Sequence, residues 1–147
     1  MKRFRFALRG LEKVRQSEVD RAYRKLAESE RARRSDEEEL MALTTALEAG
    51  WGQVARTGRV DGAALDAEAN YVGLLRHRRA AVEVQLGERI AQVEADRQQL
   101  MAARRELKAI ERLRERRYLE FLQEVMRDER EQLDDLGGQR HQRRVAA

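Results

Sequence analysis

The sequence predicts an all-α protein, a long antiparallel two-helix coiled-coil hairpin with an overhanging C-terminal helix. Three observations predict it. None of the 147 residues is proline, so nothing forces a helix to stop. Charged residues make up 39% and apolar residues 41% of the chain, a composition typical of long helices. Apolar residues also recur every seven positions, which is the coiled-coil signature. This composition excludes a compact α/β enzyme.

The first helix is expected over about residues 4–49. Its heptad line consists of Val19, Leu26, Arg33, Leu40 and Leu47. A loop follows at about 50–62, where four of the nine glycines lie, at positions 50, 52, 58 and 62. This loop is the expected tip of the hairpin.

The second helix is expected over about residues 63–136. Its heptad line consists of Leu65, Val72, Arg79, Leu86, Val93, Leu100 and Leu107. Gly137 and Gly138 predict the stop, and a basic tail over 137–147 completes a single coiled-coil domain spanning residues 1–147.

The two heptad lines predict a register for the hairpin. Aligning them places Leu40 beside Val72 and Val19 beside Val93, and it brings Arg33 and Arg79 into one layer. The same register sets the acidic residues 36–39 beside the basic residues at 76, 78 and 79.

In this register the second helix continues beyond the start of the first. Residues from about 110 to 136 would then have no partner within the chain, although they carry an apolar stripe that includes Ile110, Leu113 and Leu133. An apolar face of this kind predicts docking to another protein.

Catalytic chemistry is not expected, and neither is a cofactor, a metal site or a small-molecule substrate. The chain has no cysteine, and its two histidines, His77 and His141, lie too far apart for a convincing metal site. A solvated two-helix rod offers no cleft to shift the pKa of its many carboxylates. With no apolar run of signal-peptide or membrane-spanning length, we expect a soluble protein of a reducing compartment.

Nucleic-acid or anionic-surface binding is the alternative function. Arginine doublets at 78–79, 104–105, 116–117 and 143–144 support it, but nearby acidic residues dilute each doublet.

Two pairs of aromatic residues have two interpretations each, and two glycines have one. Phe4 and Phe6 either close the open end of the hairpin or contact a partner, and Trp51 and Tyr71 are either buried under the loop or exposed as a contact pair. Gly73 and Gly87 each cost about 1 kcal/mol relative to alanine inside a helix, and close helix approach is the expected reason.

The N-terminal Phe4-x-Phe-x-Leu-x-x-Leu11, the glycine-rich tip, Tyr71 and the C-terminal segment 111–135 resemble the FliJ family. This family belongs to the flagellar type III export apparatus and is similar to YscO of virulence systems. The most specific part is Glu111-x-Leu-x-Glu-Arg-Arg117, followed by the acidic residues Glu120, Glu124, Asp128 and Glu129 within the same segment. The family is similar to the central stalk of rotary ATPases.

The resemblance implies a non-enzymatic, stalk-like linker for bacterial flagellum biogenesis and motility. Its partners would be the export ATPase FliI ring, the export gate protein FlhA and export chaperones, and its location cytoplasmic, peripheral at the inner membrane. Carried over by position, the gate-facing tip comprises Leu40, Leu43, Leu47, Trp51, Tyr71 and Leu75. The ATPase-facing end comprises Phe4, Phe6, Leu8, Leu11, Tyr118, Phe121, Leu122 and Val125.

Overall fold

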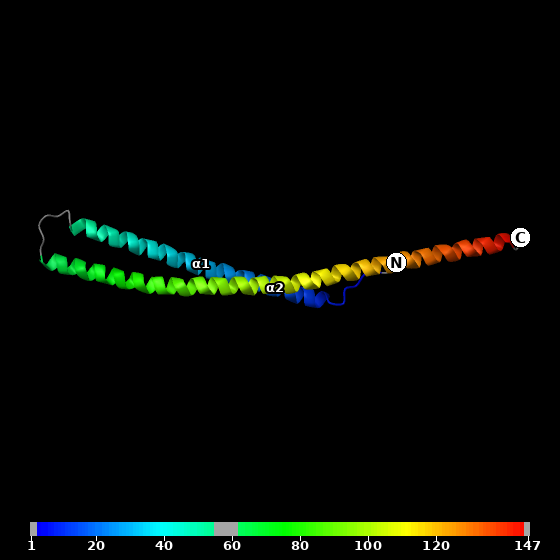
Figure 1. Cartoon of the computed structure of the whole chain (residues 1–147), viewed down its shortest axis with the longest axis horizontal. Coiled ribbons are helices and arrows are strands. Elements are labelled where there is room, and N and C mark those ends of the chain that lie inside the picture. The colour runs from blue at the N-terminus through cyan, green and yellow to red at the C-terminus, as the bar shows by residue number, and fades with distance from the viewer. Residues whose placement is uncertain (1–2, 55–61, 146–147) are drawn as a thin grey trace. The chain divides into compact units, whose positions relative to one another are not determined.

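The computed structural model describes residues 3–54 and 62–145, and the side chains of all of these except 51–54 and 136–145. It contains two long helices, α1 over Arg9–Val54 and α2 over Gly62–Val145 (Figure 1). Residues 3–6 form an extended segment that leads through a turn into α1. The predicted all-helical class is confirmed for the described residues.

Two compact units divide the chain. Unit 1 contains Met1–Val19 and Ala103–Ala147, and unit 2 contains Asp20–Ala102. Each unit combines a part of α1 with a part of α2. That the whole chain forms one folding domain stays a prediction.

The helix ends differ from the expected ones. Helix α1 begins at Arg9 rather than near residue 4. At this start the Arg9 amide donates a hydrogen bond to the Phe6 carbonyl, and Glu12 lies in the first turn. An acidic residue at that point stabilises the positive end of the helix dipole. Helix α2 continues through Gly137 and Gly138 to Val145, because glycine weakens a helix without ending it.

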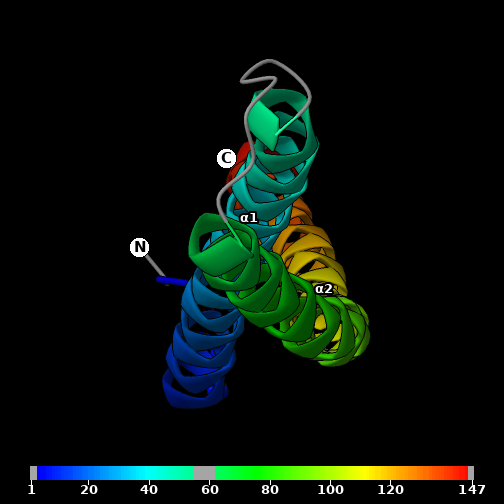
Figure 2. The ribbon, with the colours of Figure 1, turned by 90° about the vertical axis from the view of Figure 1, so that its left-hand side faces the viewer.

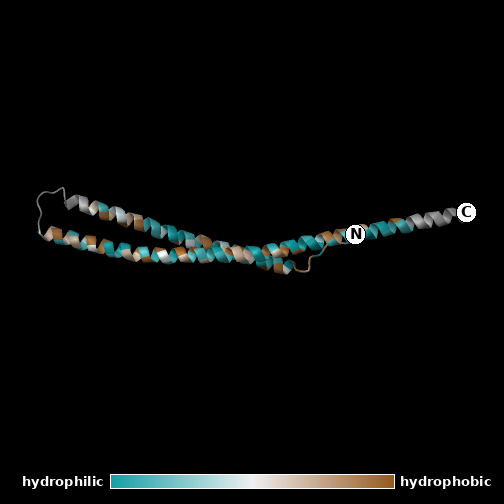
Figure 3. Ribbon diagram, viewed as in Figure 1, coloured by the Kyte–Doolittle hydropathy of each residue, from teal (hydrophilic) through white to brown (hydrophobic). Residues whose placement is uncertain are grey.

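In unit 2 the antiparallel segments of α1 and α2 pack along a narrow apolar seam. Its buried apolar side chains are Leu47, Val72, Val82, Val93 and Leu100. Figure 3 shows apolar residues recurring between hydrophilic ones along both helices. Four of these five lie on the predicted heptad lines, so the inward face of each helix is confirmed.

The predicted register is wrong by about ten residues. Val72 lies against Gly50, 3.8 Å from where a Cβ on that glycine would stand, and not against Leu40. Farther along unit 2, Arg89 pairs with Asp36 at 3.4 Å and Lys25 with Asp96 at 3.1 Å. A second inward line on each helix, offset by three or four residues from the predicted one, makes this register possible. Its buried members include Val82 and Asp96.

The prediction that Arg33 and Arg79 lie in one layer of the hairpin is also wrong. Arg33 pairs with Glu37 and Arg79 pairs with Glu83, each within its own helix, at 3.0 and 2.9 Å. The expected contact of the acidic cluster with the basic one is confirmed in part, since Arg78 pairs with Glu39 at 2.6 Å.

Unit 1 corrects the prediction that α2 has no partner from about residue 110. Arg114 pairs with Glu12 at 2.6 Å, and the ring of Phe4 lies 5.3 Å from that of Tyr118 and 5.6 Å from that of Phe121. The segment before α1 therefore covers part of α2 as far as Phe121. For the residues that follow, the overhang stays a prediction.

Close helix approach does not explain the two glycines inside α2. A Cβ added at Gly73 or at Gly87 would meet no atom within 4 Å. The expectation of tight packing at both positions is wrong.

Candidate interaction surfaces

An open groove lies between the last turns of α1 and the first turns of α2 in unit 2. We call it the tip groove; it has a volume of about 240 Å³ and is lined by Gly50, Leu65, Glu68, Ala69, Val72, Gly73 and Arg76. Figure 2 views the two helices of unit 2 end-on, from the side where α1 ends and α2 begins. The groove exists because glycine and alanine occupy positions where larger side chains would fill the space.

The predicted tip residues do not form one exposed surface. Tyr71 is 54% exposed, whereas Leu47 is buried in the seam. Leu40, Leu43 and Leu75 are half-buried. The side chain of Trp51 lies outside the described residues, so its two interpretations stay open.

The structure adds exposed apolar residues near the tip that sequence reasoning missed. Leu74 is 70% exposed and Leu65 is 42% exposed. Leu74 lies next to the predicted pair Tyr71 and Leu75, and Leu65 was assigned to the core through its heptad spacing. Only the observed register shows which of these apolar residues of α2 lie in the core and which are exposed.

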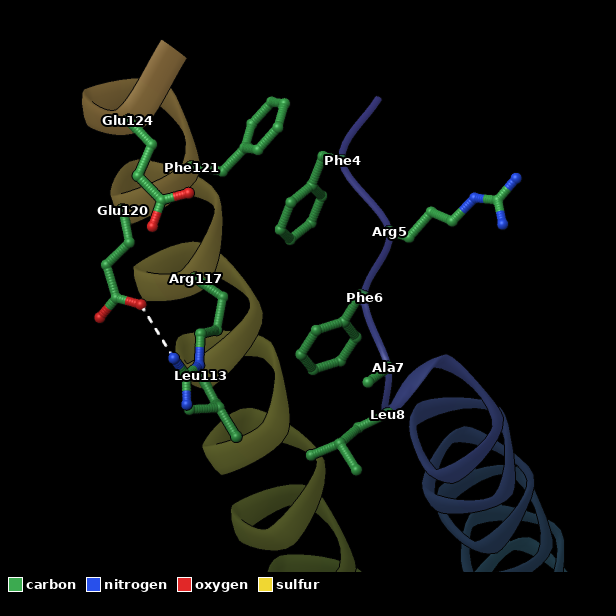
Figure 4. Close-up of a pocket in the computed structure, with 10 residues that line it drawn as sticks. All are labelled: Phe4, Arg5, Phe6, Ala7, Leu8, Leu113, Arg117, Glu120, Phe121 and Glu124. Carbon is green, nitrogen blue, oxygen red and sulfur yellow. Dashed lines mark hydrogen bonds and ion pairs between the residues drawn. The ribbon is translucent and has the colours of Figure 1, made fainter. Parts of the chain in front are cut away.

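In unit 1 the extended N-terminal segment places Phe4, Phe6 and Leu8 against α2 (Figure 4). Alternate residues of an extended chain point to one side, so these three side chains face the helix while Arg5 points away. A cavity of about 430 Å³ remains between the segment and α2, with Leu113 and Phe121 in its wall. On the helix side Arg117 is held by Glu120 at 3.1 Å.

The predicted ATPase-facing residues are brought together only in part. Phe4 contacts both Tyr118 and Phe121, which supports the interpretation that the N-terminal aromatics close the end of the hairpin. Phe6, Leu122 and Val125 are half-buried, and Leu8 and Leu11 are about two-fifths exposed.

A second apolar line of α2 in unit 1 was missed. Leu119, Met126 and Leu133 are 58%, 57% and 66% exposed and are spaced seven residues apart. We call these residues the outer line. Their spacing was visible in the sequence and could have identified them.

The seam of unit 2 contains a buried acid. Asp96 is 1% exposed and accepts hydrogen bonds from Lys25 and Gln92. Burial by itself would raise the pKa of Asp96, but these hydrogen bonds and the charge of Lys25 outweigh it and hold the pKa below its ordinary value. The carboxylate is thus a structural anion rather than a proton donor at neutral pH.

Within residues 3–54 and 62–145, no three histidine or acidic side chains are grouped so that they could hold a metal ion. None of the helical segments in those ranges has the length and apolarity that a membrane crossing requires.

The comparisons with known proteins agree with the sequence resemblance. The family model described as "Flagellar FliJ protein" matches residues 4–146, nearly the entire chain. No match was found among curated proteins or among solved structures. The chain therefore belongs to the FliJ family and is a component of flagellar protein export, in keeping with its two long helices.

Proposed function

We propose that this protein is a non-enzymatic stalk that promotes assembly of the export ATPase ring and couples the ring to the export gate. The observation that carries the proposal is the family match over residues 4–146. Exposed apolar residues in each of the two units support it, because a linker needs a separate contact surface for each partner.

The gate contact is assigned to the tip in unit 2. Tyr71 and Leu75 lie one helical turn apart on α2 and share a face, and the exposed Leu74 lies between them in the sequence. An exposed aromatic beside apolar residues is typical of the strongest contacts in an interface. Leu40, Leu43 and Leu47 then support this surface from within the seam.

The ATPase contact is assigned to unit 1. Phe4, Phe6, Tyr118 and Phe121 would hold the N-terminal segment in place, since the Phe4 ring packs against the rings of Tyr118 and Phe121. The outer line, together with Leu122 and Val125, would supply the contact surface itself. Its seven-residue spacing suits a helical partner.

The remaining parts of the proposal rest on family membership. Engagement of export chaperones and a cytoplasmic position at the inner face of the membrane, peripheral to it, follow from a role between the ATPase and the gate. Loss of the protein would then impair flagellar assembly and motility.

The nucleic-acid alternative receives little support. Arg78, Arg79 and Arg117, which belong to the predicted basic doublets, each pair with a glutamate. The hydrogen bond from Arg78 to Glu39, reinforced by the charge of Glu39, raises the pKa of Arg78 above its ordinary value. Paired arginines release fewer counterions on binding a phosphate backbone.

The test is ATPase assembly. Purified export ATPase is incubated with ATP in the presence and absence of the full chain, and ring formation is followed by electron microscopy together with ATP hydrolysis. We expect more rings and faster hydrolysis with the chain present. The variant Leu119→Ser with Met126→Ser should lose this effect, whereas Tyr71→Ala should retain it. No stimulation by the unmodified chain would contradict the proposed function.

A further inference from the structure

Two buried polar atoms in the seam of unit 2 lack a hydrogen-bond partner. Among the described side chains, these atoms are Nε of Arg33 and Oδ2 of Asp96. A terminal nitrogen of Arg33 pairs with Glu37 at 3.0 Å, and the other oxygen of Asp96 accepts from Lys25 and Gln92. A buried polar atom without a hydrogen bond destabilises the fold, so both atoms require an explanation.

The hydroxyl group near the carboxylate of Asp96 does not resolve this. Ser29 lies close enough to influence the carboxylate, but its hydroxyl donates to the Leu26 carbonyl at 3.0 Å. The two unsatisfied atoms belong to groups of opposite charge, a guanidinium and a carboxylate. Each group therefore has the chemistry that the other lacks.

The two groups lie about one heptad apart along the seam. Asp96 pairs with Lys25, which directly precedes Leu26, and Arg33 follows Leu26 by seven positions on the same heptad line. If α2 slipped by seven residues along α1, Arg33 would take the place of Leu26 beside Asp96. A slip of a whole heptad keeps the inward face of each helix inward, and it displaces one helix by about 10 Å along the other.

The apolar residues of the seam permit the same slip. Leu47 and Val82 are buried, and Leu43 and Leu86 are half-buried, on the inward lines of the two helices. After a slip of one heptad Leu47 would face Val82, and Leu43 would face Leu86. The seam would then exchange its apolar layers rather than lose them.

Other contacts favour the observed register. In unit 2 the slip would separate Asp36 from Arg89, which now pair at 3.4 Å. Both helices continue into unit 1, where the ring of Phe4 would leave those of Tyr118 and Phe121. The two unsatisfied atoms favour the other register, so the difference between the two is a balance of a few polar and aromatic contacts.

We propose that the hairpin has a second register, one heptad from the observed one, in which Arg33 and Asp96 form an ion pair within the seam. Helix α2 is then displaced toward the loop, and Lys25 loses its contact with the carboxylate. The two registers form a two-state element in which one helix moves past another by whole turns. The inference concerns the free chain and does not rest on the proposed function.

Disulfide trapping measures the two registers, because the chain has no cysteine of its own and a disulfide needs Cα atoms within about 7 Å. Leu47→Cys with Val82→Cys reports the second register, and Gly50→Cys with Val72→Cys reports the observed one. The initial rate of disulfide formation under mild oxidation is followed by mass spectrometry. Leu47→Cys with Leu86→Cys, one turn beyond the reporter pair, is the control for local unfolding and should stay reduced.

Two substitutions in the reporter chain shift the balance in opposite directions. Arg33→Gln removes the cation of the second register and should slow the disulfide at least about fivefold, equivalent to about 1 kcal/mol. Lys25→Gln removes the cation of the observed register and should accelerate it by a similar factor. Arg34→Gln, at the exposed neighbouring arginine, is the matched control and should leave the rate unchanged.

Circular dichroism establishes that each variant is folded at the temperature of the experiment. If the pair at positions 47 and 82 is not, Leu43→Cys with Leu86→Cys replaces it as the reporter of the second register. The same changes of rate are then expected for Arg33→Gln and Lys25→Gln.

Three results would overturn the inference. The first is no reporter disulfide even in Lys25→Gln. The second is an equal rate in Arg33→Gln and the unmodified background, which would mean that water or a rotation of the side chains satisfies both atoms in the observed register. The third is an equal rate for the reporter pair and the control pair at 47 and 86, which would show local unfolding instead of a defined register.

Discussion

Asp96 occupies an inward position of α2 between Val93 and Leu100, where an apolar residue would be expected. Its side chain has no exposed surface, whereas its partner Lys25 is half exposed. One carboxylate oxygen makes no hydrogen bond, so the acid is only partly compensated. Polar residues inside a coiled-coil seam lower stability but restrict the register, and we assign that effect to Asp96.

The depressed pKa of Asp96 makes its contribution dependent on pH. Because the folded-state pKa lies below the unfolded one, the carboxylate stabilises the fold above the ordinary pKa and loses this effect as pH falls through the folded value. Asp96→Asn should cost roughly 1–3 kcal/mol in the free energy of unfolding at pH 7. Because Lys25 is half exposed and water screens its charge, the expected cost lies at the lower end of this range.

Urea unfolding at pH 7 and at successively lower pH below 4 checks this prediction. The difference between Asp96→Asn and the unmodified chain should shrink as the acid protonates. Asp134→Asn, at an exposed aspartate of α2, is the control and should change stability little at any pH. A difference that stays constant down to low pH would contradict the assigned charge.

At the scale of the elements, the sequence predicted the helices and one inward line of each helix. Leu47, Val72, Val93 and Leu100 are buried as expected, because their seven-residue spacing is independent of the partner helix. The second inward line was not detected, since Asp36 and Asp96 occupy buried positions on it and interrupt the apolar pattern. Aligning only one line per helix gave the wrong register.

Disulfide trapping distinguishes the two registers. Gly50→Cys with Val72→Cys should form a disulfide within one chain under mild oxidation, because the positions are in contact. Leu40→Cys with Val72→Cys, which the predicted register would bring together, should not. Mass spectrometry of the oxidised chains under denaturing conditions measures both pairs. A disulfide at 40 and 72 alone would contradict the observed register.

The N-terminal segment of unit 1 depends on aromatic contacts, since it lies before α1 and has no helical structure over residues 3–6. Phe4→Ala removes both ring contacts, each of which is worth about 0.5–1.5 kcal/mol beyond area burial. We expect faster tryptic cleavage after Arg5, with little change in the melting temperature. Leu119→Ala, at an exposed site on α2, is the control and should cleave like the unmodified chain.

Unchanged cleavage after Arg5 in Phe4→Ala would contradict the role of these rings.

The sequence left the function of Phe4 open, because its spacing fits both closure of the hairpin and partner contact. Only the ring distances favour closure. The contacts with Tyr118 and Phe121 join residues that are more than one hundred positions apart, which no local pattern predicts.

For the whole molecule, the net charge of +4 and the many arginines leave nucleic-acid binding as an alternative function that can be measured. Because several arginines are already paired with carboxylates, we expect weak binding to a duplex DNA probe that disappears between 50 and about 200 mM salt. Fluorescence anisotropy over a salt titration measures this. Tight binding that survives physiological salt would favour the nucleic-acid function.

The candidate sites were less predictable than the fold. The sequence left burial and exposure of Tyr71 open, and its side chain is exposed, whereas Leu47, placed on the same surface, is core. The groove beside Gly73 depends on how α1 ends against α2, and composition does not give that geometry. Separate contacts in unit 1 and unit 2 nevertheless agree with the linker role expected from the FliJ resemblance.

The central claim is that one chain joins the export ATPase to the export gate through separate surfaces. Affinity-tagged ATPase is mixed with the gate's cytoplasmic part and either the unmodified chain, the variant Tyr71→Ala with Leu75→Ala, or no chain, and the retained proteins are quantified. We expect the unmodified chain to retain the gate, and the variant to stay bound to the ATPase while the gate is lost to the level seen without the chain. Equal gate retention with the variant, or no gain from the unmodified chain over its absence, would contradict the account.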